Sequence, residues 1–109
     1  MLKKSFNKKQ NTYKVTFRFE PESDVETVQL LGDFNEWGQK KQHFLKKRKN
    51  GSYSLTLSLK PQQSYEYRYF IDDKQWVTDT SADSIRWNIF GSQNSVVSID
   101  SEENTNLEN

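Results

Sequence analysis

Three tryptophans stand among polar residues, in positions where a flat ring can face solvent. Trp37 follows the sequence DFNE, Trp76 follows DDKQ, and Trp87 lies between an arginine and an asparagine. A sugar ring has an apolar C–H face and a rim of hydroxyl groups, so a sugar site needs exposed aromatic rings with hydrogen-bond donors around them. Polar neighbours argue against a core role for Trp37 and Trp76, whereas Trp87 fits an extra sugar platform and a core position equally well.

Catalytic residue types are scarce in this chain of 109 residues. It has no Cys and a single His, His43, which excludes cysteine nucleophiles and Cys/His metal sites. Glycoside hydrolysis would need two carboxylates that face each other across a cleft. The available carboxylates lie in turns or outside any run that would bury them: Asp33, Glu66, Asp72, Asp73, Asp79 and Asp83. Because His43 fits a partly exposed strand edge, we expect no enzyme activity, no metal and no cofactor.

A second binding chemistry is open to the basic segment over residues 40–49. It carries Lys40, Lys41 and the run KKRK at 46–49, and aromatic rings beside such a run can stack on the bases of single-stranded nucleic acid. The run also precedes the turn sequence Asn50-Gly51, so it fits the solvated end of a hairpin. The net charge of the chain is only +1, whereas nucleic-acid-binding domains are usually clearly basic. We therefore expect no nucleic acid partner, and keep nucleic acid binding as the lesser alternative.

Alternation of apolar and polar residues predicts the elements that position these side chains. A period of two is typical of half-buried strands. The expected strands are 13–19, 28–31, 53–59 and 65–71, with shorter candidates at 44–48, 76–78 and 95–99. No segment shows a convincing period of 3.6, so we predict an all-β antiparallel sandwich of about 7–8 strands. Residues 33–42 and 79–94 are expected to be loops.

Aromatic residues must fill much of the core, because aliphatic residues are few. On the expected strand 65–71, three tyrosines alternate with Glu66, Arg68 and Phe70, so these three side chains face outward if the tyrosines point inward. The expected aromatic core is Tyr13, Phe17, Phe19, Tyr53, Tyr65, Tyr67 and Tyr69.

The two ends of the chain have opposite charge. The first twelve residues carry four lysines and no acid, and residues 100–109 carry four acids and no base. We expect a basic disordered arm over 1–12, one domain over 13–99, and an acidic disordered tail over 100–109. The sequence lacks the apolar run of a secretory signal or a membrane span, which predicts a cytoplasmic protein with no membrane partner.

The tryptophan motifs resemble those of a known family. The stretch VQLLGDFNEW at 28–37 is similar to the L-x-G-x-F-N-x-W signature of family-48 carbohydrate-binding modules. These include the glycogen-binding domain of the AMP-activated kinase β-subunit and the N-terminal domains of isoamylases and branching enzymes, in glycoside hydrolase family 13. The likeness continues through residues 50–51, 65–72, Gln75-Trp76, Asp79 and 90–97. It covers about residues 13–99.

The resemblance implies an early-set, immunoglobulin-like β-sandwich that binds α-1,4-glucans such as glycogen, starch or maltooligosaccharides without catalysis. Position by position, it implies two stacking rings, an arginine in place of the family's lysine donor, and a loop that closes over the glucan. These residues are Trp37, Arg68, Trp76, Phe90, Gly91, Ser92 and Asn94. Gly91 also fits a turn requirement, and for Phe90 core packing is the open alternative to sugar contact.

The sequence departs from the family pattern at two turns. DDKQ at 72–75 stands where the family commonly has Asp-Gly, which would shift Trp76, and Asp79-Thr80 replaces a common Asp-Pro. The catalytic barrel of the family-13 enzymes has no counterpart here. We also expect a monomer that recruits a glycogen- or starch-metabolising enzyme in trans or acts alone. The main alternative is a protein-interaction domain that kept the sandwich and lost its sugar.

Overall fold

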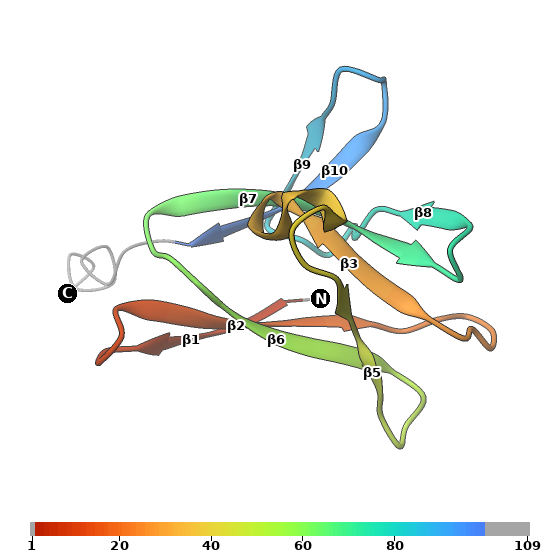
Figure 1. Cartoon of the computed structure of the whole chain (residues 1–109), viewed down its shortest axis with the longest axis horizontal. Helices are drawn as coiled ribbons and strands as arrows, with labels where there is room; N and C mark the ends of the chain where they lie inside the picture. Colours follow the sequence, from red (N-terminus) through yellow and green to blue (C-terminus); the bar gives the residue numbers. More distant parts are fainter. Residues whose placement is uncertain (1, 100–109) are drawn as a thin grey trace.

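The computed structural model describes residues 2–99, which form two antiparallel β-sheets (Figure 1). Its elements are β1 (Leu2–Asn7), β2 (Thr12–Phe19), β3 (Val28–Gly32), the short 3-10 helix η1 (Asp33–Gly38), β4 (His43–Phe44), β5 (Lys46–Lys47), β6 (Tyr53–Leu59), β7 (Gln63–Ile71), β8 (Gln75–Val77), β9 (Ser84–Trp87) and β10 (Gln93–Ile99). The smaller sheet has the order β1-β2-β6-β5, and the larger has β4-β3-β7-β10-β9 with β8 beside β7. The predicted immunoglobulin-like sandwich is confirmed.

The long strands form where apolar and polar residues alternate. On β2, Val15 and Phe17 are fully buried while Lys14 is exposed, because successive side chains point to opposite faces of a strand. On β7, Tyr67 and Tyr69 point into the core and the residues between them turn outward. The core therefore lies between β2 and β6 of one sheet and β3, β7 and β10 of the other.

Aromatic rings fill the core as predicted. All seven expected residues belong to the buried cluster or pack against it. Phe17 meets Tyr67 edge-on with ring centroids 5.0 Å apart, and Phe19 lies 5.3 Å from Tyr69. The Tyr67 hydroxyl donates to Asp79 Oδ2 at 2.8 Å, so burial of the tyrosine leaves no polar atom of its side chain unpaired.

The first twelve residues differ from the expected disordered arm. Leu2–Asn7 form β1, which pairs antiparallel with β2. Leu2 packs against the core, the Phe6 ring lies 4.9 Å from that of Tyr13, and Lys4 Nζ lies 2.6 Å from Asp83 Oδ2 of the other sheet. The unpaired edge of β2 and these contacts outweigh the lysine-rich composition. The domain boundaries at 13 and 99 stay a prediction, and the expected acidic tail lies outside the described residues.

Two short segments also differ from the expectation. The single strand expected at 44–48 is split, because β4 pairs with β3 and β5 pairs with β6. Leu45 crosses between the sheets, is buried, and donates its N–H to the Val28 carbonyl at 2.8 Å. Within the expected loop 79–94, Ser84–Trp87 form β9, an edge strand whose side chains are all exposed. No helix among residues 2–99 is long and apolar enough to cross a membrane.

Candidate functional site

The outer face of β7 brings together two of the predicted site residues, Arg68 and Trp76. β7 lies between β3 and β10, and β8 folds back beside its C-terminal half. Arg68 stands opposite Leu31 of β3, and Phe70 stands opposite Trp76 of β8. Because their neighbours Tyr67 and Tyr69 point into the core, the side chains of Arg68 and Phe70 point to the outer face of the sheet, as the alternation predicts.

Trp76 is the exposed ring of this face. Its ring packs against Phe70 with centroids 4.6 Å apart and planes inclined by 34°, yet the residue stays 43% exposed. The Arg68 guanidinium carbon lies 5.0 Å from the Trp76 ring centroid, within the range of a cation–π contact. Arg68 Nε is buried and has no hydrogen-bond partner among the described residues. The arrangement presents an aromatic surface with a cationic donor beside it.

The turn between β7 and β8 holds Trp76 in place. Asp72 and Asp73 adopt left-handed backbone angles, φ 52° and 56°, which aspartate tolerates better than most residues. Asp72 Oδ1 accepts hydrogen bonds from the N–H groups of Glu26 at 2.7 Å and Thr27 at 2.9 Å. The departure from the family's Asp-Gly therefore gives a turn anchored to the loop that precedes β3.

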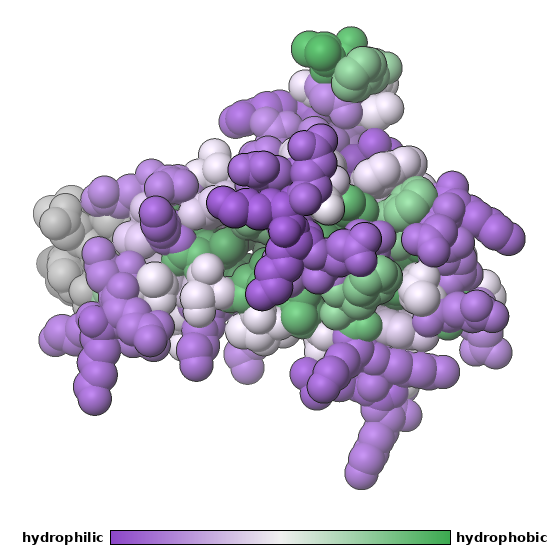
Figure 2. All heavy atoms as spheres, viewed as in Figure 1, coloured by the Kyte–Doolittle hydropathy of each residue, from purple (hydrophilic) through white to green (hydrophobic). Residues whose placement is uncertain are grey.

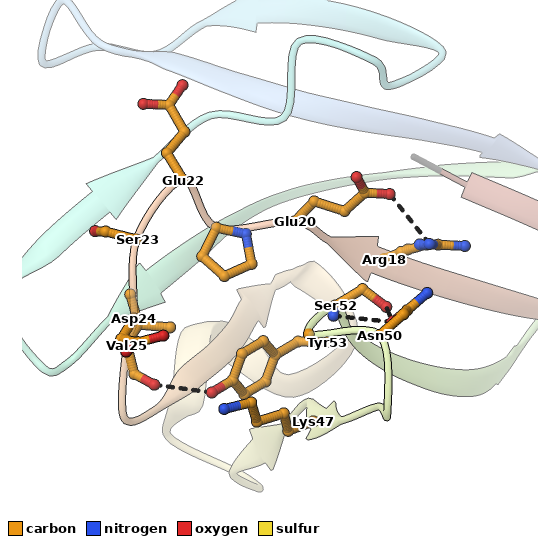
Figure 3. A pocket seen from close by; sticks show the side chains of 12 residues that line it. Arg18, Glu20, Glu22, Ser23, Asp24, Val25, Lys47, Asn50, Ser52 and Tyr53 are labelled. Carbon is orange, nitrogen blue, oxygen red and sulfur yellow. Dashed lines mark hydrogen bonds and ion pairs between the residues drawn. The ribbon is translucent and has the colours of Figure 1, made fainter.

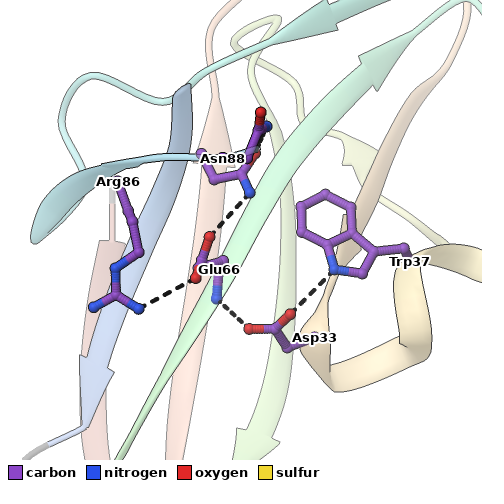
Figure 4. Close-up of polar contacts among 6 residues, drawn as sticks. Asp33, Trp37, Glu66, Arg86 and Asn88 are labelled. Atoms are coloured by element: carbon purple, nitrogen blue, oxygen red, sulfur yellow. Dashed lines mark hydrogen bonds and ion pairs between the residues drawn. The ribbon is translucent and has the colours of Figure 1, made fainter. Parts of the chain in front are cut away.

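Trp37 is fixed through an acidic residue at the start of η1. Its indole Nε1 donates to Asp33 Oδ1 at 3.1 Å, and Asp33 Oδ2 accepts from the backbone N–H of Glu66 at 2.8 Å (Figure 4). The half-buried ring is thereby held toward the Glu66 end of β7, while Trp76 stands opposite Phe70. Arg68 falls between the two tryptophans along the strand.

The turn that carries Trp37 is organised by Asn35, which is 1% exposed. Asn35 Oδ1 accepts from the N–H groups of Gly32 at 3.1 Å and Gly38 at 3.2 Å. Its Nδ2 donates to the Leu30 carbonyl at 2.9 Å and lies 3.0 Å from His43 Nδ1. These contacts hold a backbone in which Trp37 itself has φ 55°. The asparagine of the family signature is thus a structural anchor.

Gly32 allows β3 to pass close to β7. A Cβ atom at this position would lie 2.6 Å from the Glu66 carbonyl oxygen, and 2.8 Å from both Phe34 Cζ and Tyr67 Cβ. Such distances are shorter than van der Waals contact, so a larger residue would push the η1 turn away from β7.

A polar network joins β7 to the β9–β10 hairpin. Glu66 Oε1 accepts from Asn94 Nδ2 at 3.0 Å, and Glu66 Oε2 accepts from Arg86 at 3.2 Å. Asn88 Nδ2 donates to Asn94 Oδ1 at 3.3 Å. Asn94 is only 6% exposed, so its amide is shared with the protein. From the sequence, Glu66 was considered only as one of the available carboxylates for catalysis, and its role in this network was not predicted.

The remaining predicted residues lie on the hairpin. Phe90 is 85% exposed at the turn between β9 and β10, which excludes the core-packing alternative. Ser92 is half-buried and accepts from the Asn88 N–H through its carbonyl at 2.8 Å. Gly91 has φ +79°, which supports the turn interpretation. Trp87 is 67% exposed, so it is no core plug, and it points to the face of β9 opposite Arg86.

Sequence reasoning identified the exposed rings and missed the groups that orient them. The structure brings Arg68 and Trp76 together and places Trp37 at the other end of β7. Asp33, Glu66 and Asn88 orient this face, and only the turn residue Asp33 carried a local sequence signal, the tendency of aspartate to bind nearby backbone. No group of three or more potential metal ligands occurs within residues 2–99.

A separate pocket of about 310 Å³ lies away from the tryptophans (Figure 3). It opens between the loop at 20–25 and the segment from Asn50 to Tyr53. Its polar groups bind one another: Arg18 pairs with Glu20 at 3.2 Å, and the Tyr53 hydroxyl donates to the Val25 carbonyl at 2.8 Å. None of the predicted site residues lines it.

Comparison with known proteins agrees with the geometry. The family model described as the glycogen recognition site of AMP-activated protein kinase matches residues 10–105. No curated protein sequence matches the chain. The matching family is a carbohydrate-binding module, which is a non-catalytic domain. The resemblance at the tryptophan motifs is thereby confirmed over nearly the whole chain, which belongs to the family of the glycogen recognition site of AMP-activated protein kinase.

Proposed function

We propose that the outer face of β7 binds α-1,4-glucans without catalysis, with Trp76 as the main stacking platform and Trp37 as the second. Arg68 lies between them and supplies N–H donors to sugar hydroxyls. The observation that carries this proposal is the half-exposed Trp76 ring, which is supported from behind by Phe70 and has a guanidinium at 5.0 Å.

The hairpin residues complete the proposed site from the side. Phe90 and Ser92 border it, and Phe90 is exposed enough to meet a bound chain. Asn94, whose amide is shared with Glu66 and Asn88, holds the hairpin against β7.

The expected affinity for a short oligosaccharide is modest. Two rings that each remove about 100 Å² of apolar surface from water contribute roughly 5 kcal/mol. Each polar contact adds about 1 kcal/mol, and association costs about 4 kcal/mol or more. The balance corresponds to a dissociation constant in the micromolar to millimolar range.

The test is a calorimetric titration of the Trp76→Ala variant with maltoheptaose. Loss of the platform should weaken binding by about 2.5 kcal/mol, close to two orders of magnitude. Trp87→Ala is the matched control, because Trp87 is equally an exposed tryptophan and faces the opposite side of the sheet.

Far-ultraviolet circular dichroism and a cooperative thermal unfolding transition should verify that both variants keep the native fold. Equal affinity of the native chain and the folded Trp76→Ala variant would contradict the proposed site, and so would a loss confined to Trp87→Ala.

A further inference from the structure

The β9–β10 hairpin carries exposed apolar side chains on β9, at the edge of the larger sheet, and at its tip. Trp87 is 67% exposed, Ile89 at the tip is 92% exposed, and Ile85 is 37% exposed. Phe90, also at the tip, belongs to the proposed glucan site and is not counted in this surface. Figure 2 shows apolar atoms at the hairpin tip, separated from the rest of the apolar surface. Exposed apolar patches of this kind are uncommon on proteins that act alone.

The backbone of β9 is open on the same side. The Asn88 N–H donates to the Ser92 carbonyl at 2.8 Å, which marks this pair as hydrogen-bonded. Hydrogen-bonded and non-bonded pairs alternate in an antiparallel ladder, so the N–H and C=O groups of Ile85 and Trp87 point away from β10. They lie on the free edge of the sheet, because β9 is the last strand in the order of the larger sheet.

Edge strands are commonly protected by lysine, proline, a bulge or short length. β9 is short, with four residues, but it carries no lysine or proline. The one charged residue of β9, Arg86, has its guanidinium bound to Glu66 on the sheet face at 3.2 Å. Its charge is thereby partly neutralised.

In place of the monomer expected from the sequence, we propose that β9 pairs antiparallel with β9 of a second copy of this chain, across a two-fold axis at Arg86. Ile85 of each copy then stands opposite Trp87 of the other copy. In each of these two pairs, the backbone N–H and C=O groups of the two residues form hydrogen bonds with one another. A β-branched residue opposite an aromatic residue is a favourable cross-strand pair. The two Arg86 side chains approach each other at the axis, and each brings Glu66 as its counter-ion.

The exposed area suits a weak, reversible dimer. Ile85, Trp87 and Ile89 offer on the order of 400 Å² of apolar surface per copy. Two copies would bury roughly 800 Å² in all, which is the size range of weak and transient interfaces. The net charge of +1 gives little repulsion between copies.

The symmetry has a consequence that rests on the proposed function. A two-fold axis perpendicular to the sheet leaves the outer faces of both β7 strands on the same side. Two weak glucan sites would then engage one polymer together, and a branched glucan would be held more tightly than a short oligosaccharide by a factor of about 10² or more.

The first test measures the association state of the full chain without sugar. Sedimentation velocity from micromolar to millimolar protein should show a reversible monomer–dimer equilibrium. The Arg86→Cys variant should form a disulfide-linked dimer on mild oxidation. The two copies of residue 86 would form a non-hydrogen-bonded antiparallel pair, whose Cα atoms lie within disulfide range, and the native chain has no cysteine to compete. Ser58→Cys, on the exposed face of β6, is the control and should cross-link at least tenfold more slowly.

Two variants then separate this edge from other contacts. Ile85→Pro removes only an outward N–H, and Trp87→Lys adds a charge to the edge. Each should abolish the dimer while leaving maltoheptaose affinity unchanged and lowering retention on glycogen. Three results would overturn the proposal. The native chain could remain monomeric at every concentration, Arg86→Cys could cross-link no faster than Ser58→Cys, or the dimer could persist in both edge variants. A dimer that binds no glucan would instead refute the proposed function and leave the interface standing.

Discussion

Asn35 fixes the protonation state of its neighbour His43. Its Oδ1 accepts two backbone hydrogen bonds, from Gly32 and Gly38, so the atom that faces His43 is the donor Nδ2. His43 Nδ1 must therefore accept, which requires the neutral imidazole. Partial burial and the nearby Lys41 charge lower the pKa of His43 from 6.5, in agreement with this geometry.

The lowered pKa predicts that acid weakens the folded state. Above pH 6.5 His43 is neutral in the folded and unfolded chain, so its contribution is fully present. As the pH falls below that value the unfolded chain takes up the proton first, and folding becomes less favourable. Urea unfolding should show a lower midpoint at about pH 5 than at neutral pH.

The control for this prediction is His43→Gln, which cannot titrate. Its unfolding midpoint should depend less on pH over the same interval. If the native chain and the variant lose stability in parallel, His43 is not the group responsible.

At the scale of elements, η1 is a turn held by side chains more than by its own helical hydrogen bonds. Glu36 and Trp37 both adopt left-handed angles inside it. Such angles persist only when surrounding contacts enforce them. The Asn35 bonds and the Asp33 bridge to β7 are the contacts that do so.

The Asn35→Ala substitution should therefore cost much more than an ordinary turn mutation. It leaves the buried N–H of Gly32, the part-buried N–H of Gly38 and the Leu30 carbonyl without their partner, and we expect a loss of about 2–4 kcal/mol in the free energy of unfolding. Chemical denaturation measures it. Gln39→Ala, at an exposed position just after η1, should change stability by less than about 0.5 kcal/mol. Equal effects of the two variants would show that Asn35 does not hold the turn.

Which elements could be predicted from the sequence follows from how each is stabilised. β2, β6 and β7 were predictable because one face of each is buried, which imposes alternation. β1 was missed, because pairing with the open edge of β2 stabilises it although three of its six residues are exposed and two of those are lysines. β9 was missed because its side chains are all exposed, so no burial pattern marks it.

The candidate site divides in the same way. The outward direction of Arg68 followed from alternation with buried tyrosines, and the tryptophans were marked by polar neighbours. The link from Trp37 through Asp33 to Glu66 spans 33 residues between its last two members, and no local pattern encodes such a contact. The three-dimensional structure was needed to show which groups orient the rings.

At the scale of the whole molecule, the sandwich separates the packed core from the proposed binding site. Tyrosine and phenylalanine rings fill the space between the sheets, and two tryptophans with Arg68 stand on the outer face of the larger sheet. The basic residues at 40–49 are exposed, so a salt-dependent nucleic acid contact is the competing chemistry to test.

The most direct measurement is a calorimetric titration of the native chain with maltoheptaose, cellohexaose and single-stranded DNA at low and high salt. We predict saturable binding of maltoheptaose, in the micromolar to millimolar range, that barely changes with salt, and much weaker or no binding of cellohexaose. No binding of maltoheptaose at millimolar concentration, or binding of DNA alone with a steep loss at high salt, would contradict glucan recognition by this face.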